Sequence, residues 1–303
     1  MNLKSTDSSA GPFEHRIRAR GAVLDMPLTQ ELYKPLLERQ RRDGVVVHRD
    51  LIYGLAARHT LDLYQPQGSA AAPVPCLLFF HGGGFVRGDK SERENVGQYF
   101  ARQGYAVAVV NYRLAPENVW PCGAEDVIAA YRWLIDGLQR WNIDRRRIYL
   151  AGESAGAAHV AAAALIKRFH PAEGLAVAGA ILISGVYNAQ LEWLAREEFG
   201  VATPDPRNEP YFGSDFSRYA AMSTVELIDA KSMPLLITYA ELDPAQMQVQ
   251  AGELFARLMT VHGFKPRLRI IRGHNHLTQG YAVNTGDESL TAPILAFLHE
   301  TST

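Results

Sequence analysis

Short apolar runs alternate along most of the chain with longer segments whose apolar positions recur at helical spacing. Runs typical of buried strands cover residues 77–80, 106–110, 148–150, 178–183 and 233–240, and residues 267–271 alternate apolar and polar positions. Helical spacing predicts helices near residues 93–103, at 124–138 and after Ser154. Strands that alternate with helices need crossover connections, so the pattern predicts a mostly parallel central sheet with helices on both faces.

Three regions depart from this alternation. Residues 45–47 and 61–64 favour an antiparallel pair of strands ahead of the sheet, and the segment up to residue 42 has leucines at helical spacing. Residues 185–232 are rich in aromatic and charged residues but show no strand pattern, and a connection of about fifty residues far exceeds an ordinary loop.

We therefore expect a domain organisation with one α/β domain and a cap. Residues 45–184 and 233–303 form the α/β domain, residues 185–232 are inserted as the cap, and residues 1–44 contribute to that cap. Residues 1–12 are expected to be disordered.

Composition excludes several classes of partner. The formal net charge is −1 and the pI is about 6.8, which gives no electrostatic footprint for nucleic acid or an anionic membrane. The polar N-terminus lacks an apolar signal region, and no apolar stretch approaches the length of a membrane span. Two cysteines, Cys76 and Cys122, provide neither a disulfide framework nor a metal cluster. We expect a cytoplasmic monomer or homodimer that binds no metal and no cofactor.

The strongest chemical signal is Gly152-Glu153-Ser154-Ala155-Gly156. It lies between the strand-like residues 147–151 and a segment with helical character. A serine on a tight turn from strand to helix is lifted clear of the sheet, and the flanking glycines leave room for the strained backbone. Ser154 is therefore the candidate nucleophile.

A serine hydroxyl needs an imidazole to take its proton and a buried carboxylate to orient that imidazole. Both groups are expected just after later strands, and Asp243 and His276 stand at those places. Glu241 competes with Asp243, but strand alternation and the turn at Pro244 favour the aspartate. His274 competes with His276, which we favour because it lies further into the loop.

Three consecutive glycines follow the apolar strand that ends at Phe80, in the sequence His81-Gly82-Gly83-Gly84-Phe85. Without Cβ atoms, such a loop brings backbone amides close to a ligand, and acyl transfer needs donors where the carbonyl oxygen becomes negative. We assign the amides of Gly83, Gly84 and Ala155 to an oxyanion hole.

Together these motifs resemble the hormone-sensitive-lipase-like branch of the α/β-hydrolases, the bacterial family IV esterases. The resemblance covers residues 45–298 and rests on the glycine and serine motifs, on Asn-Tyr-Arg-Leu-Ala-Pro-Glu at 111–117 and on Trp120-Pro121. It implies the α/β-hydrolase fold with a helical cap, the triad Ser154, Asp243 and His276, and a structural role for Asp126 behind the oxyanion loop.

The sequence also departs from the pattern of that branch. Glu153 replaces a frequent aspartate and Ala157 a frequent glycine, while Asn-His-Leu-Thr at 275–278 replaces the usual His-Gly-Phe. The last difference changes the surroundings of the base rather than the triad.

The expected activity is that of a serine carboxylesterase acting on short- to medium-chain esters through an acyl-enzyme intermediate. The residues expected to line its substrate pocket are Phe85, Tyr187, Trp193, Phe199, Phe212 and Leu277. An amide hydrolase such as an aryl formamidase could use the same triad, so that alternative stays open. A ligand-binding receptor on a hydrolase scaffold is the non-enzymatic alternative, and the presence of His276 argues against it.

Overall fold

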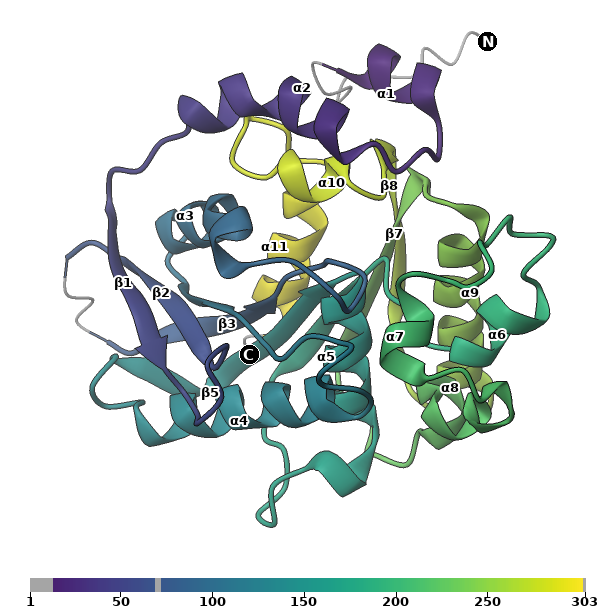
Figure 1. Cartoon of the computed structure of the whole chain (residues 1–303). Coiled ribbons are helices and arrows are strands. Elements are labelled where there is room, and N and C mark those ends of the chain that lie inside the picture. Colours follow the sequence, from purple (N-terminus) through teal and green to yellow (C-terminus); the bar gives the residue numbers. More distant parts are fainter. Residues whose placement is uncertain (1–12, 69–71, 302–303) are drawn as a thin grey trace, which may run out of the picture.

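The computed structural model of the protein describes residues 13–68 and 72–301. The expectation of disorder for residues 1–12 lies outside these described residues. One sheet of eight strands, in the order β1-β2-β4-β3-β5-β6-β7-β8, forms the centre of the molecule (Figure 1). The strands are β1 (Val45–Ile52), β2 (Thr60–Pro66), β3 (Val74–Phe80), β4 (Ala106–Val110), β5 (Ile143–Glu153), β6 (Gly179–Ile183), β7 (Leu235–Leu242) and β8 (Arg267–Asn275).

Strand directions follow the prediction. β2 pairs antiparallel with both β1 and β4, whereas every other neighbouring pair is parallel. The predicted antiparallel start and the mostly parallel remainder are therefore confirmed. Because β3 to β8 run in one direction, their carboxyl ends meet at one edge of the sheet, which is where open α/β sheets bind ligands.

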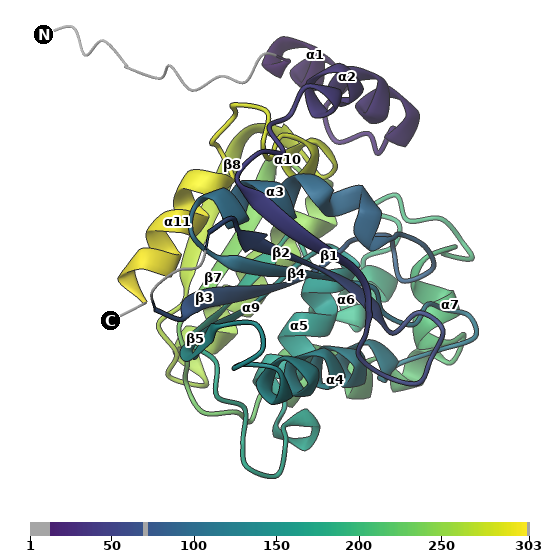
Figure 2. The ribbon, with the colours of Figure 1, turned by 90° about the vertical axis from the view of Figure 1, so that its left-hand side faces the viewer.

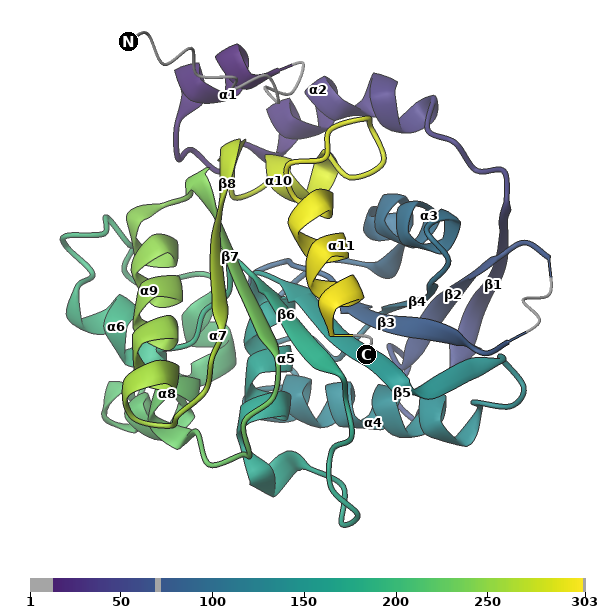
Figure 3. The same cartoon turned by 180° about the vertical axis from the view of Figure 1, so that it is seen from behind.

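Both faces of the central strands are buried. On β3, Cys76, Leu78 and Phe80 pack into the core on one face, while Leu77 and Phe79 pack into the core on the other. The first face is covered by α4 (Cys122–Asp136), α5 (Ala155–Leu165) and α9 (Ala245–Thr260), and the second by α3 (Glu94–Arg102) and α11 (Thr291–Glu300) (Figures 1 and 3). Burial on both faces explains why these strands are apolar runs rather than alternating ones.

The predicted helices at 93–103, at 124–138 and after Ser154 correspond to α3, α4 and α5. Two further helices, α9 between β7 and β8 and α11 after β8, complete the layers, although the sequence analysis did not predict them. The chain enters the fold through α1 (Glu14–Arg20) and α2 (Met26–Glu38), and the leucine spacing before residue 42 corresponds to α2.

The segments expected to form a cap differ in where they lie. α1 and α2 cross the carboxyl edge of the sheet beside β8 and α10 (Thr278–Tyr281) (Figures 1 and 2). The insertion, residues 185–232, has no strand, as predicted, and contains α6 (Ala189–Leu194), α7 (Asn208–Phe212) and α8 (Thr224–Leu227). It packs mainly beside α5 and α9, so most of it flanks the sheet instead of covering its edge.

Within the described part of the chain, no helix is long and apolar enough to cross a membrane. The same residues contain no group of three or more histidine, cysteine, aspartate or glutamate side chains arranged to hold a metal ion. Cys76 and Cys122 are both buried free thiols.

Candidate active site

Ser154 occupies a strained turn between β5 and α5. Its φ of 51° lies in the left-handed region, which residues other than glycine rarely adopt. The two flanking glycines are required by close packing. A Cβ on Gly152 would lie 2.4 Å from the backbone of Gly156, and a Cβ on Gly156 would lie 2.1 Å from the carbonyl oxygen of Phe80. The sequence motif thus reflects steric necessity on both sides of the serine.

The structure brings Ser154, His276 and Asp243 together in a chain of hydrogen bonds. The Oγ of Ser154 lies 2.9 Å from Nε2 of His276, and Nδ1 of His276 lies 2.8 Å from Oδ1 of Asp243. The Asp243 side chain is fully buried and that of His276 is 9% exposed. An ionised carboxylate can only accept, so Nδ1 donates to Asp243, which leaves Nε2 free to accept from the serine hydroxyl.

A local turn decides which of the two histidines faces the serine. The Oδ1 of Asn275 accepts from the amide of Thr278, and the Oγ1 of Thr278 accepts from the amide of Asn275. This reciprocal pair of hydrogen bonds turns the chain between β8 and α10. His276 therefore faces Ser154, whereas His274 is buried with Nε2 3.2 Å from Oδ2 of Asp287.

Glu241, the competing acid, lies away from the histidine. Both of its carboxylate oxygens accept hydrogen bonds from Arg18 on α1, and one of them also accepts from the amide of Gly273. The hydrogen bond from Arg18 lowers the pKa of Glu241 below its usual value. Glu241 therefore anchors α1 to the ends of β7 and β8.

Ser184 and Gln279, which the sequence analysis missed, hold Asp243 in place. The Oδ2 of Asp243 accepts from the Ser184 hydroxyl at 2.6 Å and from the amide of Ala240 at 2.8 Å. Gln279 in turn donates to the Ser184 oxygen at 2.7 Å. Ser184 directly follows β6, whose carboxyl end lies between those of β5 and β7. That position is the one signal that could have identified it from sequence.

The glycine loop, residues 81–88, lies against the serine turn. Gly83 and Gly84 have positive φ angles of 142° and 59°. A Cβ on Gly83 would lie 1.9 Å from the carbonyl oxygen of Arg87, and one on Gly84 would lie 2.9 Å from the Arg207 side chain. Gly83, Gly84 and Ala155 line one cavity together with Ser154 and His276. The three predicted oxyanion-hole residues thus surround the serine.

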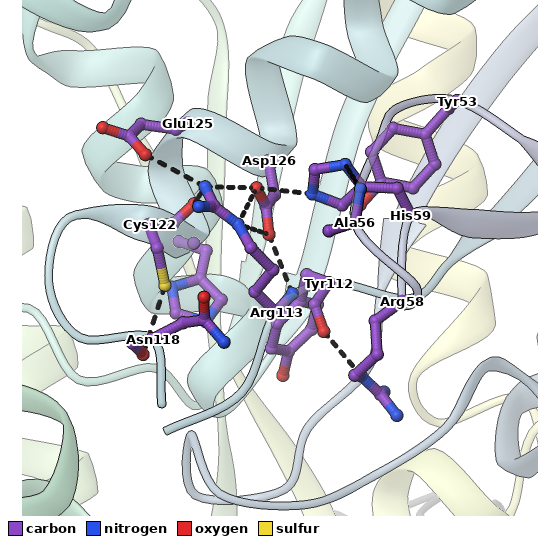
Figure 4. Close-up of polar contacts among 12 residues, drawn as sticks. Tyr53, Ala56, Arg58, His59, Tyr112, Arg113, Asn118, Cys122, Glu125 and Asp126 are labelled. Atoms are coloured by element: carbon purple, nitrogen blue, oxygen red, sulfur yellow. Dashed lines mark hydrogen bonds and ion pairs between the residues drawn. The ribbon is translucent and has the colours of Figure 1, made fainter. Parts of the chain in front are cut away.

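Asp126 lies in a polar network with Arg113 and His59 (Figure 4). Its carboxylate accepts from the amide and the side chain of Arg113 and lies 3.0 Å from Nε2 of His59. These contacts tie α4 to the segment after β4, where Tyr112 donates to the carbonyl oxygen of His81 and stacks on its ring. Asp126 therefore supports the segment against which the glycine loop packs and does not contact the cavity.

Two fully buried histidines lie beneath the cavity. Burial lowers the pKa of His81 to about 4 and that of His159 to about 3. His81 stacks on Tyr112, and His159 packs edge-on against Phe85. Both imidazoles are neutral near pH 7 and serve as packing groups.

The cavity above Ser154 has a volume of about 290 Å³. Of the six residues predicted to line it, Phe85 and Leu277 do so. The N-terminal helical region contributes Leu24, Met26 and Gln30, while the insertion contributes Val186, Arg207 and Asn208. Arg87 and Glu92 add exposed charged side chains to the lining.

The other four predicted pocket residues, Tyr187, Trp193, Phe199 and Phe212, are not among those lining this cavity. Tyr187 is buried in the main core, and Phe212 packs against Phe85 and Trp120. Trp193 stacks on Phe216 at the outer surface with 37% of it exposed. The structure therefore does not bring these four residues into the cavity, and the rings of Tyr187, Phe212 and Trp193 instead fasten the insertion to the core and to itself.

Comparison with known proteins agrees with this geometry. Residues 77–279 match a family described by the alpha/beta hydrolase fold. An ethyl acetate hydrolase of Pseudomonas putida is 28% identical over 266 residues, which cover 78% of this chain and 78% of that protein. A solved structure of a bacterial heroin esterase superposes with a TM-score of 0.75 at 26% identity, covering 97% of this chain and 98% of the other.

A shorter match links the chain to a protein with a different role. The gibberellin receptor GID1 of Oryza sativa subsp. japonica is 34% identical over 126 residues, but these cover only 39% of this chain and 34% of the receptor. The match to the receptor therefore spans a minority of both chains, unlike the two matches to hydrolases.

Proposed function

The chain belongs to the α/β-hydrolase-fold family, in its hormone-sensitive-lipase-like branch, and from this membership we propose that it is a serine carboxylesterase. The observation that carries the proposal is the pair of hydrogen bonds from Ser154 to His276 and from His276 to Asp243, at 2.9 and 2.8 Å. That arrangement has the geometry that nucleophilic acyl transfer requires.

In the proposed mechanism, the Oγ of Ser154 attacks the ester carbonyl carbon while Nε2 of His276 accepts the hydroxyl proton. Asp243 stabilises the imidazolium that forms, and the amides of Gly83, Gly84 and Ala155 stabilise the negative oxygen of the tetrahedral intermediate. His276 then gives the proton to the departing alcohol, which leaves an acyl-enzyme. Water, activated by the same histidine, attacks the acyl-enzyme, and the acid and free Ser154 are released.

The cavity supports short to medium acyl chains as substrates. Its volume of about 290 Å³ is modest, and its opening carries the charged side chains of Arg87, Glu92 and Arg207. Each buried methylene of an acyl chain contributes about 0.8 kcal/mol, but only while it finds apolar space. We expect hydrolysis of esters with about two to eight acyl carbons and a steep fall beyond that length.

We also propose the division of the chain into an α/β catalytic domain, residues 45–184 and 233–303, and a cap made by residues 1–44 and 185–232. In the described residues, Met26 and Gln30 from α2 and Asn208 from α7 support a shared role in covering the cavity. Because α2 contributes to the opening, the N-terminal segment is expected to limit substrate size more than the aromatic residues of the insertion do.

A panel of p-nitrophenyl esters with increasing acyl length, assayed beside aryl formamides of similar size, tests the proposal. We expect turnover of the short esters by the wild-type enzyme and none above background by Ser154→Ala. Hydrolysis of the formamides without the esters would assign the protein to amide hydrolysis instead. Absence of any turnover, with tight binding of a small ligand, would favour a receptor.

A further inference from the structure

The residue that precedes the serine takes part in a buried ion pair. The Nε of Arg93, on the 3-10 turn before α3, lies 2.5 Å from Oε1 of Glu153, and the two side chains are only 7% and 10% exposed. Burying two charges has a large desolvation cost, so such a pair is a weak source of stability compared with apolar packing. Because Glu153 directly precedes Ser154 and contacts the glycine loop, the ion pair points to a role in fixing the geometry of the active site.

The same carboxylate oxygen holds the glycine loop. Oε1 of Glu153 accepts from the amide of Gly82 at 3.1 Å, and Gly83 and Gly84 follow directly. Gly82 also lies close to the serine, since a Cβ on it would be 3.3 Å from the Cβ of Ser154. Glu153 therefore connects the serine turn to Gly82, the residue directly before the two glycines of the proposed oxyanion hole.

The pair also contacts the segment that carries the histidine. A Cβ on Gly280 would lie 2.6 Å from Oε2 of Glu153, and the guanidinium of Arg93 lies 4.9 Å from the centre of the Tyr281 ring. Both residues belong to α10, which begins two residues after His276. Three segments of the site, carrying nucleophile, oxyanion donors and base, thus meet at one ion pair.

We propose that Arg93 and Glu153 are positioning residues that hold the glycine loop in the geometry needed to stabilise the transition state, an inference that rests on the proposed ester hydrolysis. Arg93 fixes the Glu153 carboxylate, and the carboxylate fixes the amide of Gly82. The amides of Gly83 and Gly84 then point to where negative charge develops. A glutamate at this position extends its carboxylate one methylene further than an aspartate, far enough to meet Arg93 and Gly82 at once.

Two charge-free double variants of similar volume isolate the contact with Gly82. Arg93→Met with Glu153→Gln keeps an oxygen that can accept from the Gly82 amide, whereas Arg93→Met with Glu153→Met removes it. We expect kcat of the double variant with Glu153→Met to be at least about tenfold below that of the double variant with Glu153→Gln, with a much smaller change in KM. If the double variant with Glu153→Met does not fold, the single variant Glu153→Asp takes its place. It keeps both charges but shortens the side chain by one methylene, and we expect the same loss of kcat.

A second readout separates positioning from general structural damage. A trifluoromethyl ketone forms a tetrahedral adduct on the serine and places an oxyanion in the hole, so its inhibition constant should rise by the factor by which kcat/KM falls. As a control, Glu209 accepts from Arg196 and from the amide of Asp205 in the same pattern, outside the cavity. Arg196→Met with Glu209→Met removes an ion pair and a backbone hydrogen bond of the same kind, and kcat should stay within about twofold of the wild type.

Equal kcat values and equal inhibition constants for the two double variants, both folded, would overturn this inference. That result would leave the proposed function intact, because the wild-type enzyme would still hydrolyse esters. Failure of the wild-type enzyme on every ester would instead refute the proposed function itself.

Discussion

Two histidines at the end of β8 each contact a buried carboxylate, yet only one of them faces the serine. His276 lies 2.8 Å from Asp243 and 2.9 Å from Ser154, and it lines the cavity. His274 lies 3.2 Å from Asp287 and 3.2 Å from the hydroxyl of Thr278, and neither His274 nor Asp287 lines it. The comparison shows that a histidine–carboxylate pair is not itself a catalytic signal. Access to a nucleophile and to a cavity separates the two pairs.

The carboxylates of the two pairs are also held by different groups. Asp243 is held by Ser184 and by a tight turn at the end of β7, so its second oxygen is saturated with donors. For Asp287, burial opposes ionisation, but the hydrogen bond and charge of His274 keep the pKa of Asp287 below its ordinary value. The Asp287 pair therefore stabilises the loop after α10, while the Asp243 pair is poised to accept a proton from a serine.

The largest expected difference comes from removing one histidine at a time. His276→Ala should lower kcat by about four orders of magnitude or more, similar to Ser154→Ala, because the triad acts as a unit. His274→Ala should keep at least a tenth of the activity and lose about 1–3 kcal/mol of unfolding free energy, because the buried Asp287 carboxylate loses its contact with Nε2 of His274. Steady-state kinetics and chemical denaturation measure the two effects. An inactive His274→Ala beside an active His276→Ala would reverse the assignment.

Changing the two carboxylates to amides sharpens the comparison. Asp243→Asn should lower kcat by about 10⁴-fold with little change in KM, because an asparagine amide in place of the carboxylate favours the wrong tautomer of His276. Asp287→Asn should leave kcat within a few-fold of the wild type while lowering the melting temperature. Stopped assays with p-nitrophenyl acetate measure kcat in both variants. Similar losses of kcat in the two variants would contradict the separation of roles.

A third histidine, His159, is fully buried and has no carboxylate partner among the described residues. Burial lowers its pKa to about 3, whereas an unfolded chain binds this proton near pH 6.5. The unfolded state therefore binds more protons as the pH falls from about 6.5 to about 3, and the native state loses up to about 1.4 kcal/mol per pH unit. His159→Leu should flatten this part of the stability profile.

Urea denaturation at several pH values tests this prediction. His299→Leu is the matched control because His299 is exposed on α11, and it should leave the pH profile unchanged. An unaltered acid limb in His159→Leu would show that other groups cause the acid sensitivity.

The smallest expected effect concerns acyl length. Leu277→Ala, which enlarges the cavity beside His276, should move the preferred ester by one or two methylenes, worth about 0.8 kcal/mol each. Trp193→Ala should not move it, because Trp193 stacks on Phe216 outside the cavity. Ratios of kcat/KM across the ester panel measure both variants. A shift of the acyl-length preference in Trp193→Ala would show that the outer aromatic residues do line the substrate pocket.

Several features could be predicted from sequence because they depend on local patterns. The apolar runs of β3 to β7 identify a doubly covered parallel sheet, since such strands bury both faces. The Gly-x-Ser-x-Gly turn is partly local, because a Cβ on Gly152 would meet the backbone of Gly156 in the same turn, whereas a Cβ on Gly156 would meet Phe80 on the neighbouring strand β3. The order of acid and histidine follows from the order of the strands.

Tertiary structure alone decided the features that depend on contacts between distant segments. Whether His274 or His276 faces Ser154 depends on the reciprocal hydrogen bonds of Asn275 and Thr278. The role of Glu153 depends on Arg93, sixty residues earlier, and the side chains lining the cavity depend on how α2 and the insertion pack. Aromatic residues in an insertion are buried wherever apolar surface is available, so their presence alone does not say whether they face a substrate or the core.

The sequence by itself determined the sheet, the serine turn and the chain order of the candidate triad, because these follow from local backbone geometry and strand order. Which side chains share a cavity was determined only by packing between segments far apart in the chain.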